Sequence, residues 1–271
     1  MLSPAMQIAA YDLLEQVRRQ RPLVHHLTNW VTIYDCAQVV KTLGASPVMA
    51  HAPEEVEEMT GLASALVLNI GTLTVDLVEA MKLAARRANQ KGIPVVLDAC
   101  GAGATAMRDR KCIELLNAAK IDIIKGNASE IARVSGEAVQ TRGVDAAEVA
   151  GNLESMARKL AQSRKATVVV TGEEDVVVGG HALYRARNGH PLMTRVVGTG
   201  CMAASVIGAF AAVEPDAALA AACALSCFGV AGELAAERAA GPASFKQFLF
   251  DELYKLDRET MAKRQKLDAG A

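Results

Sequence analysis

The segment 94–103 reads Pro94-Val95-Val96-Leu97-Asp98-Ala99-Cys100-Gly101-Ala102-Gly103, an apolar run followed by a glycine-rich turn with one carboxylate. A strand with apolar side chains on both faces is typical of a parallel sheet that is covered by helices on both sides. The run Val168-Val169-Val170 repeats this pattern. Because such runs alternate with longer helical patterns, the sequence predicts an α/β fold with helices on both faces of a mostly parallel sheet.

The same alternation places the other elements along the chain. Strands are expected at 23–25, 46–50, 65–70, 94–97, 122–124 and 166–171, and a hairpin is expected at 176–184. Helices are expected at 34–43, from Pro53 onward, at 75–89, 108–118 and 145–162, and over most of 199–254. We expect one domain over residues 1–271, in which the polar residues 255–271 form a frayed helix end or a flexible tail.

The composition excludes several classes of protein. Lys plus Arg is 29 and Asp plus Glu is 30, so the net charge of −1 provides no long-range attraction to nucleic acid or an anionic membrane. The six cysteines form no C-x-x-C pair, which indicates reduced thiols and a cytoplasmic protein, and no secretory signal pattern precedes Arg21. The apolar stretch 200–236 is divided by Glu214-Pro215-Asp216, which favours two buried helices over a membrane span.

Small, polar and charged residues follow the predicted strands. In an open parallel sheet the carboxyl ends of the strands share one edge, and ligands bind there. The residues that follow five strands in this way are His51, Asn69 with Gly71 and Thr72, Asp98 with its glycines, Lys125-Gly126-Asn127 with Glu130, and Thr171-Gly172-Glu173. Five such clusters predict an active-site rim along one edge of the sheet.

The segment Gly198-Thr199-Gly200-Cys201 immediately precedes an apolar helix. Two glycines allow backbone N–H groups to converge, and a helix N-terminus adds the positive end of its dipole, so we predict an anion hole formed by Gly198, Thr199 and Gly200. The pKa of a Cys201 thiol in the first turn would tend to fall. The alternative is an ordinary loop-to-helix transition with a buried cysteine.

Asp98 and Glu130 are the two acids expected near this anion hole. Paired carboxylates that face a phosphate site usually act through a hard cation such as Mg²⁺. In the alternative interpretation, Asp98 caps the glycine-rich turn and Glu130 caps a helix together with Asn127. The match of Gly101-Ala102-Gly103 to a dinucleotide-binding pattern is weak, because it follows a middle strand, and the sequence has no P-loop.

Several longer segments between about 21 and 210 form a recognisable set, in which the pieces Gly-Ala-Ser-Pro-x-Met and Gly-Thr-Gly-Cys-Met together are highly specific. They are His25-His26-Leu27-Thr28-Asn29, Gly44-Ala45-Ser46-Pro47-Val48-Met49, Leu68-Asn69-Ile70-Gly71-Thr72, Gly126-Asn127-Ala128-Ser129-Glu130, Val170-Thr171-Gly172 and Gly198-Thr199-Gly200-Cys201-Met202. With these segments the chain resembles the hydroxyethylthiazole kinase family of the ribokinase-like superfamily. The resemblance implies a ribokinase-like three-layer αβα sandwich and transfer of phosphate from ATP, with Mg²⁺, to the primary alcohol of 4-methyl-5-(2-hydroxyethyl)thiazole in thiamine salvage. It also implies a homotrimer with active sites at subunit boundaries.

The resemblance further implies a role for each matching residue. It assigns substrate binding to Met49, Gly198 and Asn29, ATP binding to Lys125 and Thr171, and the metal and triphosphate region to Asp98 and Glu130. Cys201 occupies the position where most ribokinase-like kinases carry a catalytic aspartate.

This chain departs from the family pattern at three places. Ala99-Cys100 replaces the usual Pro-Val after the aspartate, Lys125 replaces an arginine and loses its bidentate geometry, and segment 30–38 carries Asp35 and Cys36. Three alternatives remain at this point: a ribokinase-like enzyme for hydroxymethylpyrimidine or another small substrate, a non-catalytic regulator that binds thiazole or nucleotide, and a covalent cysteine nucleophile.

Overall fold

A computed structural model describes residues 10–136 and 146–270, with only the backbone described at 146–152. Within these residues, nine strands form one sheet in the order β2-β1-β3-β4-β5-β6-β7-β8-β9. The first six strands in this order, β1 to β6, are parallel to their neighbours among these six, and the pairs β6–β7, β7–β8 and β8–β9 are antiparallel. Their bounds are β1 Leu23–Leu27, β2 Ser46–Val48, β3 Ala65–Asn69, β4 Val95–Asp98, β5 Ile123–Asn127, β6 Thr167–Thr171, β7 Asp175–Gly179, β8 Ala182–Ala186 and β9 Leu267–Ala269.

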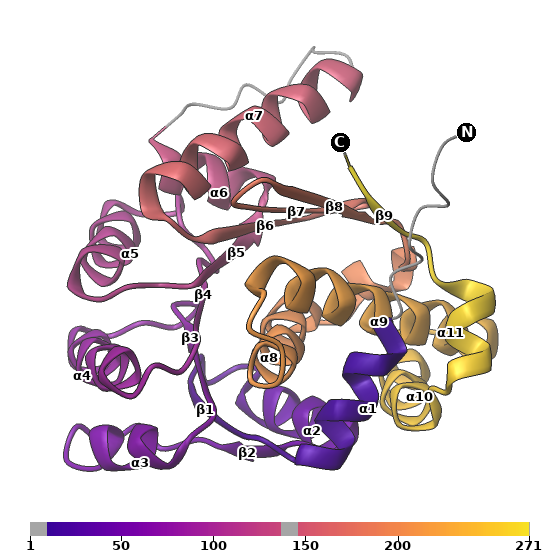
Figure 1. Ribbon diagram of the computed structural model, residues 1–271, viewed down its shortest axis with the longest axis horizontal. Coiled ribbons are helices and arrows are strands. Elements are labelled where there is room, and N and C mark those ends of the chain that lie inside the picture. Colours follow the sequence, from indigo (N-terminus) through magenta and orange to yellow (C-terminus); the bar gives the residue numbers. More distant parts are fainter. Residues whose placement is uncertain (1–9, 137–145, 271) are drawn as a thin grey trace.

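Helices cover both faces of this sheet (Figure 1). One face carries α3 Val56–Leu62, α4 Val75–Lys91, α5 Ala106–Ala118, α6 Ala128–Ser135 and α7 Ala146–Arg164. The other carries α1 Ala10–Gln20, α2 Ile33–Leu43, α8 Thr199–Ala211, α9 Ala217–Arg238, α10 Pro242–Lys255 and α11 Arg258–Arg264. The predicted three-layer sandwich with a mostly parallel central sheet is therefore confirmed. Asp145, where the helix before Arg164 was expected to begin, lies outside the described residues.

The apolar strands separate two cores. Val96 packs into the core beneath α8 and α9, whereas Val95 and Leu97 pack into the core beneath α4 and α5. Successive side chains of a strand point to opposite faces, so a central strand must be apolar at every position. A Cβ at Gly208 of α8 would lie 2.4 Å from Val67 Cγ2 on β3. Gly208 thus allows α8 to approach the sheet closely.

The helix α9 is long and apolar enough to cross a membrane, but 78% of its most apolar window is buried inside the protein. Figure 1 shows α9 beside α8, α1 and α10, and it contacts all three. Both α8 and α9 are core helices, as the sequence predicted.

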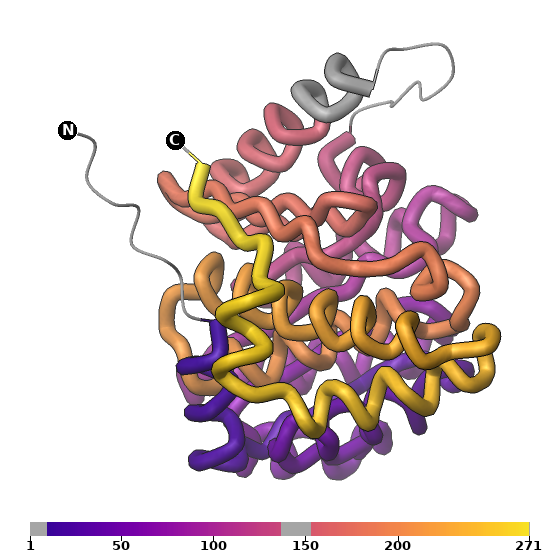
Figure 2. The backbone as a smooth tube through the Cα atoms, turned by 90° about the vertical axis from the view of Figure 1, so that its right-hand side faces the viewer, coloured from indigo at the N-terminus to yellow at the C-terminus, as the bar shows by residue number. Residues whose placement is uncertain are grey.

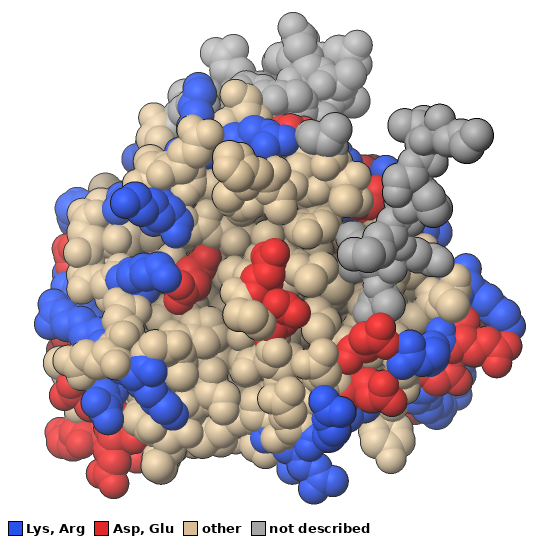
Figure 3. Space-filling view, in the orientation of Figure 1, with Lys and Arg blue, Asp and Glu red and all other residues tan. Residues whose placement is uncertain are grey.

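On the face drawn in Figure 3, charges of both signs are mixed around the rim.

The prediction that residues 255–271 form a frayed end or flexible tail was wrong. Residues 258–264 form α11, and β9 pairs with β8 through Ala186 and Leu267 (Figure 2). Arg258 bonds to Asp12 and Glu15 of α1, which ties this segment to the N-terminal helix. Within 255–270, the buried apolar side chains are Leu256, Met261 and Leu267, so the local pattern is too polar to predict either element.

Candidate active site

The ends of neighbouring parallel strands bring together a buried polar network at one edge of the sheet. Asn69 ends β3 and donates from Nδ2 to Asp98 Oδ2 at the end of β4 (2.7 Å), and Lys125 Nζ on β5 donates to Asp98 Oδ1 (3.1 Å). Asn29, which follows β1, donates from Nδ2 to Asn69 Oδ1 (3.0 Å) and to Cys201 Sγ on α8 (3.3 Å). All five side chains are less than 9% exposed. The predicted rim thus includes a connected chain of polar groups from β1 to β5 and α8.

The first turn of α8 lies against this network. Gly198 precedes the helix with φ +92°, and a Cβ there would lie 2.5 Å from Thr32 Cγ2. The N–H groups of a helical first turn have no intrahelical acceptor, so those of Thr199, Gly200 and Cys201 are available to an anion. A Cβ at Gly200 would lie 3.2 Å from Lys125 Nζ, which places this ammonium beside the same turn.

The Thr199 hydroxyl is used for hydrogen bonds to backbone carbonyls and is therefore not a donor for an anion. Its Oγ1 lies 2.8 Å from the carbonyl oxygens of both Met193 and Val196, to which it donates. Met193 lies in the short 3₁₀ helix Pro191–Arg195, and Val196 directly follows this helix. The side chain of Thr199 therefore holds the preceding turn in place, and its backbone N–H is the donor left for an anion.

The Cys201 thiol has its pKa lowered to about 5. The largest cause is a hydrogen bond from the Cys100 thiol, and burial opposes it; Thr32, Lys125 and Asn69 lower the pKa further. The same hydrogen bond raises the pKa of Cys100, because its proton is held against the Cys201 sulfur. The two shifts together favour negative charge on Cys201 and a proton on Cys100.

Asp98 and Lys125 form an ion pair that is almost completely buried. Burial raises the pKa of Asp98 to about 7, although the Lys125 ammonium opposes the rise. Burial acts to lower the pKa of Lys125, but Asp98, Glu130 and Cys201 together raise it above its ordinary value. Lys125 therefore remains a cation and supplies the positive charge beside the first turn of α8.

Glu130 forms a capping box at the start of α6. Its Oε2 accepts from the N–H of Asn127 (2.8 Å), and the Asn127 side chain accepts from the N–H of Glu130 (3.0 Å). Its Oε1 accepts from the N–H of Gly101 (2.8 Å), which joins α6 to the glycine-rich turn after β4. The structural role that the sequence left open for Glu130 is therefore present.

The two acids differ from a directly coordinating metal pair. Both oxygens of Asp98 and both of Glu130 already have hydrogen-bond partners. Among the side chains that the structure describes, no group of three or more His, Cys, Asp or Glu is arranged to hold a metal ion. This donor set fits a hydrated Mg²⁺ that is held mainly by nucleotide phosphates and meets the carboxylates through water, which is a common arrangement for Mg²⁺.

The remaining predicted residues lie further along the same edge. Thr171 ends β6 and donates from Oγ1 to the carbonyl of Gly126 (3.3 Å), two strands from Asp98. Met49 follows β2 at the other end, and its carbonyl contacts His51 Nδ1 (2.8 Å). His51 in turn meets the N–H of Thr28 (3.2 Å). The structure thus brings Asn29, Asp98, Lys125 and Cys201 into one network, with Thr171 and Met49 at its two flanks.

The segment after β1 is organised around Asn29. Its Oδ1 accepts from the N–H groups of Val31 and Thr32 and from the Thr32 hydroxyl, at 3.0–3.1 Å. Asp35 forms an ion pair with Lys246 of α10 (2.7 Å), and Cys36 lies 3.7 Å from the Thr32 hydroxyl. The two unusual residues of segment 30–38 thus join α2 to α10 and to the loop beside Gly198.

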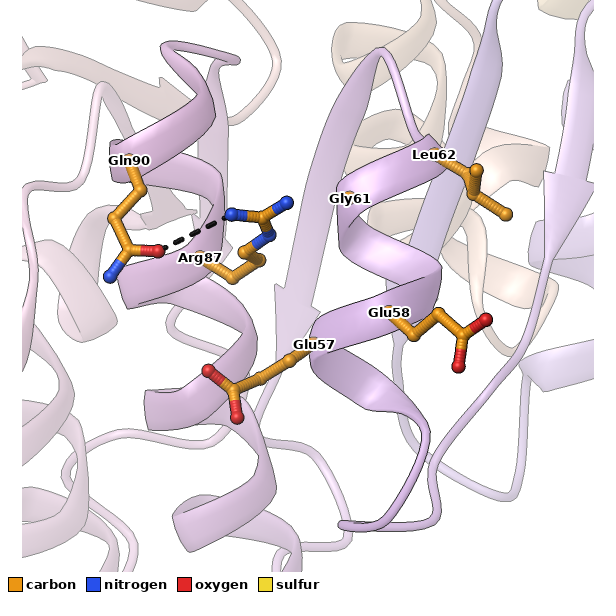
Figure 4. Close-up of a pocket in the computed structure, with 6 residues that line it drawn as sticks. All are labelled: Glu57, Glu58, Gly61, Leu62, Arg87 and Gln90. Atoms are coloured by element: carbon orange, nitrogen blue, oxygen red, sulfur yellow. Dashed lines mark hydrogen bonds between the residues drawn. The ribbon is translucent and has the colours of Figure 1, made fainter.

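A separate hollow of about 480 Å³ lies between α3 and α4 (Figure 4). It is lined by Glu57, Glu58, Gly61, Leu62, Arg87 and Gln90, and Arg87 donates to Gln90 (3.5 Å). This hollow is on the sheet face opposite α8, away from the strand-end network (Figure 1). Its open position and mixed charges favour a solvent-filled surface groove.

The family model of the hydroxyethylthiazole kinase family matches residues 14–259. The chain belongs to the hydroxyethylthiazole kinase family. A hydroxyethylthiazole kinase of Methanosarcina mazei is 52% identical over 255 residues, which cover 94% of this chain and 98% of the relative. Another, from Methanosarcina acetivorans, is 51% identical over 246 residues, 91% of this chain and 94% of the relative.

A solved hydroxyethylthiazole kinase structure from Pyrococcus horikoshii OT3 superposes with a TM-score of 0.88 at 41% identity. It covers 97% of this chain and 99% of its own. A ribokinase-like superfamily protein from Enterococcus faecalis V583 shares the fold at a TM-score of 0.62 and 15% identity, over 94% of this chain and 99% of its own. The fold is therefore ribokinase-like, and the chain is an enzyme, a kinase of the hydroxyethylthiazole kinase family.

Sequence reasoning missed two members of this site. Cys100 was recognised only as a departure from the family pattern, yet it is the largest cause of the low pKa of Cys201. Asn69 was placed on the rim without a role, although it links Asn29 to Asp98. Asn69 ends β3 and Cys100 follows β4, so their positions at the sheet edge were predictable, but their partners come from segments that are distant in the chain.

Proposed function

We propose that this protein transfers the γ-phosphoryl group of ATP to the primary alcohol of 4-methyl-5-(2-hydroxyethyl)thiazole, as a salvage step that supplies thiamine synthesis. The observation that carries this proposal is the Cys201 sulfur in the first turn of α8, to which Asn29 donates, with the Lys125 ammonium beside the same turn. Family membership supports the substrate class.

The mechanism is in-line phosphoryl transfer, which depends on positioning and charge stabilisation more than on a strong base. The N–H groups of Thr199, Gly200 and Cys201 bind the transferring phosphoryl group at the positive end of α8. The Lys125 ammonium stabilises the negative charge that develops on the oxygens of the transferring phosphoryl group. Thr171, at the end of β6, binds the nucleotide further along the rim.

Cys201 accepts the hydroxyl proton of the substrate. A thiolate with a pKa of about 5 is a weak base, yet a loose phosphoryl-transfer transition state leaves the alcohol proton in place until late in the step. This explains how a cysteine can occupy the aspartate position of related kinases. A covalent cysteine nucleophile is the rival mechanism, and it would need two successive phosphoryl transfers where direct attack by the substrate hydroxyl needs one.

Asp98 and Glu130 would be the acids nearest a Mg²⁺ ion bound with ATP, and that ion would supply neutralisation of the phosphate charge. Asp98 also keeps Lys125 in position through the 3.1 Å contact. Glu130 fixes the glycine-rich turn through the N–H of Gly101, so that this turn can border the triphosphate.

Substrate binding is proposed for Met49, Gly198 and Asn29. Gly198 has no side chain, so Thr32 packs directly against its backbone beside the anion hole, and Met49 supplies an apolar contact for the thiazole ring. Asn29 has every polar atom engaged with Asn69, Cys201 or the 31–32 turn, so it acts mainly by orienting the Cys201 sulfur.

The chain is proposed to act as one cytoplasmic domain over residues 1–271 and to assemble as a homotrimer with active sites at subunit boundaries. Trp30, Val31, Tyr34 and Val197 flank Asn29 and Gly198 and are 56–73% exposed. Large apolar side chains concentrated beside a site are typical of a surface that another subunit covers. Light scattering during size-exclusion chromatography tests this state, and a monomer at micromolar concentration would contradict it.

The function is tested by ADP release from ATP and Mg²⁺ with hydroxyethylthiazole, with hydroxymethylpyrimidine and substrate-free reactions as controls. We expect thiazole-dependent ADP release and a product whose mass and fragmentation place phosphate on the alcohol. Release with hydroxymethylpyrimidine alone would contradict the substrate, and thiazole binding without ADP release would indicate a non-catalytic regulator.

A further inference from the structure

An arginine in the first turn of α5 bridges two of the loops that form the rim. Arg108 Nη1 donates to the carbonyl oxygens of Ile70 (2.8 Å) and Cys100 (3.3 Å). Its Nη2 donates to the carbonyl oxygen of Gly71 (2.7 Å). Ile70 and Gly71 follow β3, whereas Cys100 follows β4. One guanidinium group therefore joins the loop after β3 to the glycine-rich turn after β4.

Both the backbone and the guanidinium group of Arg108 are held in place. Its backbone N–H donates to the Thr105 hydroxyl (3.3 Å), which caps the start of α5. A Cβ at Gly101 would lie 2.7 Å from Arg108 Nη1, and Gly101 has a φ of +78°. A glycine at this position therefore provides both the left-handed backbone and the space that the guanidinium group occupies.

The loop after β3 leads to the sulfur of Cys201 through a short series of hydrogen bonds. The N–H of Gly71 donates to Asn69 Oδ1 (2.9 Å), and Asn29 Nδ2 donates to the same oxygen (3.0 Å). Asn29 Nδ2 also donates to Cys201 Sγ (3.3 Å). Arg108 holds the carbonyl of the same Gly71. Its contacts thus extend through this loop to the proposed proton acceptor.

The glycine-rich turn also has anchors of its own. Glu130 at the start of α6 accepts from the N–H of Gly101 (2.8 Å). Asp109 of α5 accepts from the N–H of Gly103 (2.7 Å). This turn therefore keeps contacts to α5 and α6 without the guanidinium group of Arg108, which adds the link to the loop after β3.

We propose that Arg108 is a positioning residue for phosphoryl transfer, which sets the separation between the alcohol side and the nucleotide side of the site. The loop after β3 positions Asn29 and Cys201 for the alcohol, and the glycine-rich turn borders the triphosphate. A planar guanidinium group offers its N–H donors in a fixed fork, so it can hold carbonyls of two loops at once. A misplacement of about 1 Å can cost about a hundredfold in rate. This inference rests on the proposed function, because its rate effects are measured on that reaction.

Two properties of the Arg108 side chain can be separated by substitution. Arg108→Lys keeps the positive charge but places its donors on one nitrogen at the end of a shorter side chain, so it does not hold both loops together. Arg108→Ala removes the donors and leaves space for an added guanidinium ion. If the positive charge alone matters, lysine suffices, whereas a role of the fork requires a guanidinium group.

The first experiment measures kcat and KM for ATP in thiazole-dependent ADP release at saturating hydroxyethylthiazole. We expect Arg108→Ala to lower kcat by about 10–100-fold and to change KM for ATP by less than about threefold, because the proposed nucleotide contacts Lys125 and Thr171 stay in place. Arg108→Lys should be nearly as slow as Arg108→Ala. Millimolar guanidinium chloride should raise kcat of Arg108→Ala several-fold and leave kcat of the unmodified protein unchanged.

Arg164 provides a matched control near the other end of α5. Its Nη1 donates to the carbonyl of Leu116 (3.3 Å) and to Asn117 Oδ1 (2.7 Å), so Arg164→Ala removes a comparable bridge away from the rim. This variant should keep the kcat of the unmodified protein, even where its midpoint of urea unfolding falls as far as that of Arg108→Ala. An equal loss of kcat in both variants would assign the effect to general destabilisation and overturn the proposal.

Amide hydrogen exchange provides a readout that does not depend on the reaction. Mass spectrometry of peptides that contain residues 70–73 and 99–104 reports the two loops in protein without substrates. Exchange should accelerate in both peptides for Arg108→Ala and Arg108→Lys, and in neither for Arg164→Ala. Unchanged exchange, or full activity of Arg108→Lys, would overturn the positioning role. If the unmodified protein does not phosphorylate the thiazole, the proposed function fails, while the exchange result still decides whether Arg108 holds the two loops together.

Discussion

The ionisation of Cys201 provides a quantitative test of the active-site geometry. Iodoacetamide reacts with thiolates, so its rate follows the ionised fraction of each cysteine. With a pKa of about 5, Cys201 is about 91% thiolate at pH 6 and fully thiolate at pH 8, and the rate should change by only about 1.1-fold. A thiol at the ordinary value of 9.0 would accelerate about a hundredfold over the same interval. The slope is the diagnostic quantity, because a low pKa also reduces intrinsic nucleophilicity.

The perturbation is Cys100→Val, which removes the largest cause of the low pKa. A hydrogen bond to a charged group contributes about 1.5–3 kcal/mol, and one pKa unit corresponds to about 1.4 kcal/mol. The midpoint of Cys201 should therefore rise from about 5 to about 6–7. The rate between pH 6 and 8 should then increase about fourfold, for a midpoint near 6.5.

The assay measures alkylation at each cysteine by peptide mass spectrometry over pH 4–9, with Cys36→Ala as the control that should keep the unmodified midpoint. An unchanged midpoint in Cys100→Val would show that Cys100 does not stabilise the thiolate. A rate that still rises about tenfold per pH unit between 6 and 8 in the unmodified protein would refute the low pKa of Cys201 itself.

Three substitutions test the rest of the site. Cys201→Asp should keep or raise turnover because an aspartate can accept the same proton, whereas Cys201→Ala should lower kcat by about 10²–10⁴-fold. ADP release measures both variants. A folded but inactive Cys201→Asp protein would contradict the role of Cys201 as proton acceptor. Gly198→Ala should destabilise the protein by about 2–4 kcal/mol in urea unfolding, because the residue has a left-handed φ and the added Cβ overlaps Thr32. The control Gly92→Ala has a φ of +76° and open surroundings among the described residues, so it should cost about 1 kcal/mol. Equal costs would exclude the overlap. Lys125→Met should destabilise by about 3–5 kcal/mol because Asp98 stays buried without its partner, and adding Asp98→Asn should recover most of the loss; no recovery would contradict the ion-pair explanation.

The α/β sandwich and its binding edge were predictable from local pattern. Apolar runs such as 95–97 require burial on both faces, and parallel strands place their carboxyl ends together. The rule located Asp98, Lys125 and Thr171 on the rim before any contact was known. The glycines beside Cys201 similarly indicated a helix N-terminus that faces an anion.

Local pattern failed where an element depends on distant partners. The strand β9 is three residues long and exists because β8 offers it a free edge, while Arg258 reaches back to α1. The role of Glu130 likewise could not be decided from local pattern. Glu130 has a cap-like spacing from Asn127 and is also an acid expected near the anion hole, and only the contacts to Gly101 and Asn127 show that its oxygens bind the backbone.

The sequence by itself determined the layers, the strand ends and the helix N-terminus, because hydrophobic period and glycine placement are local properties. Only the tertiary structure decided the chemical state of Cys201. Its thiolate depends on Cys100, Asn69 and Lys125, which arrive from three different strands after long separations in the chain. A pKa is set by charges and donors within a few ångströms in space, and folding alone brings these groups to one sulfur.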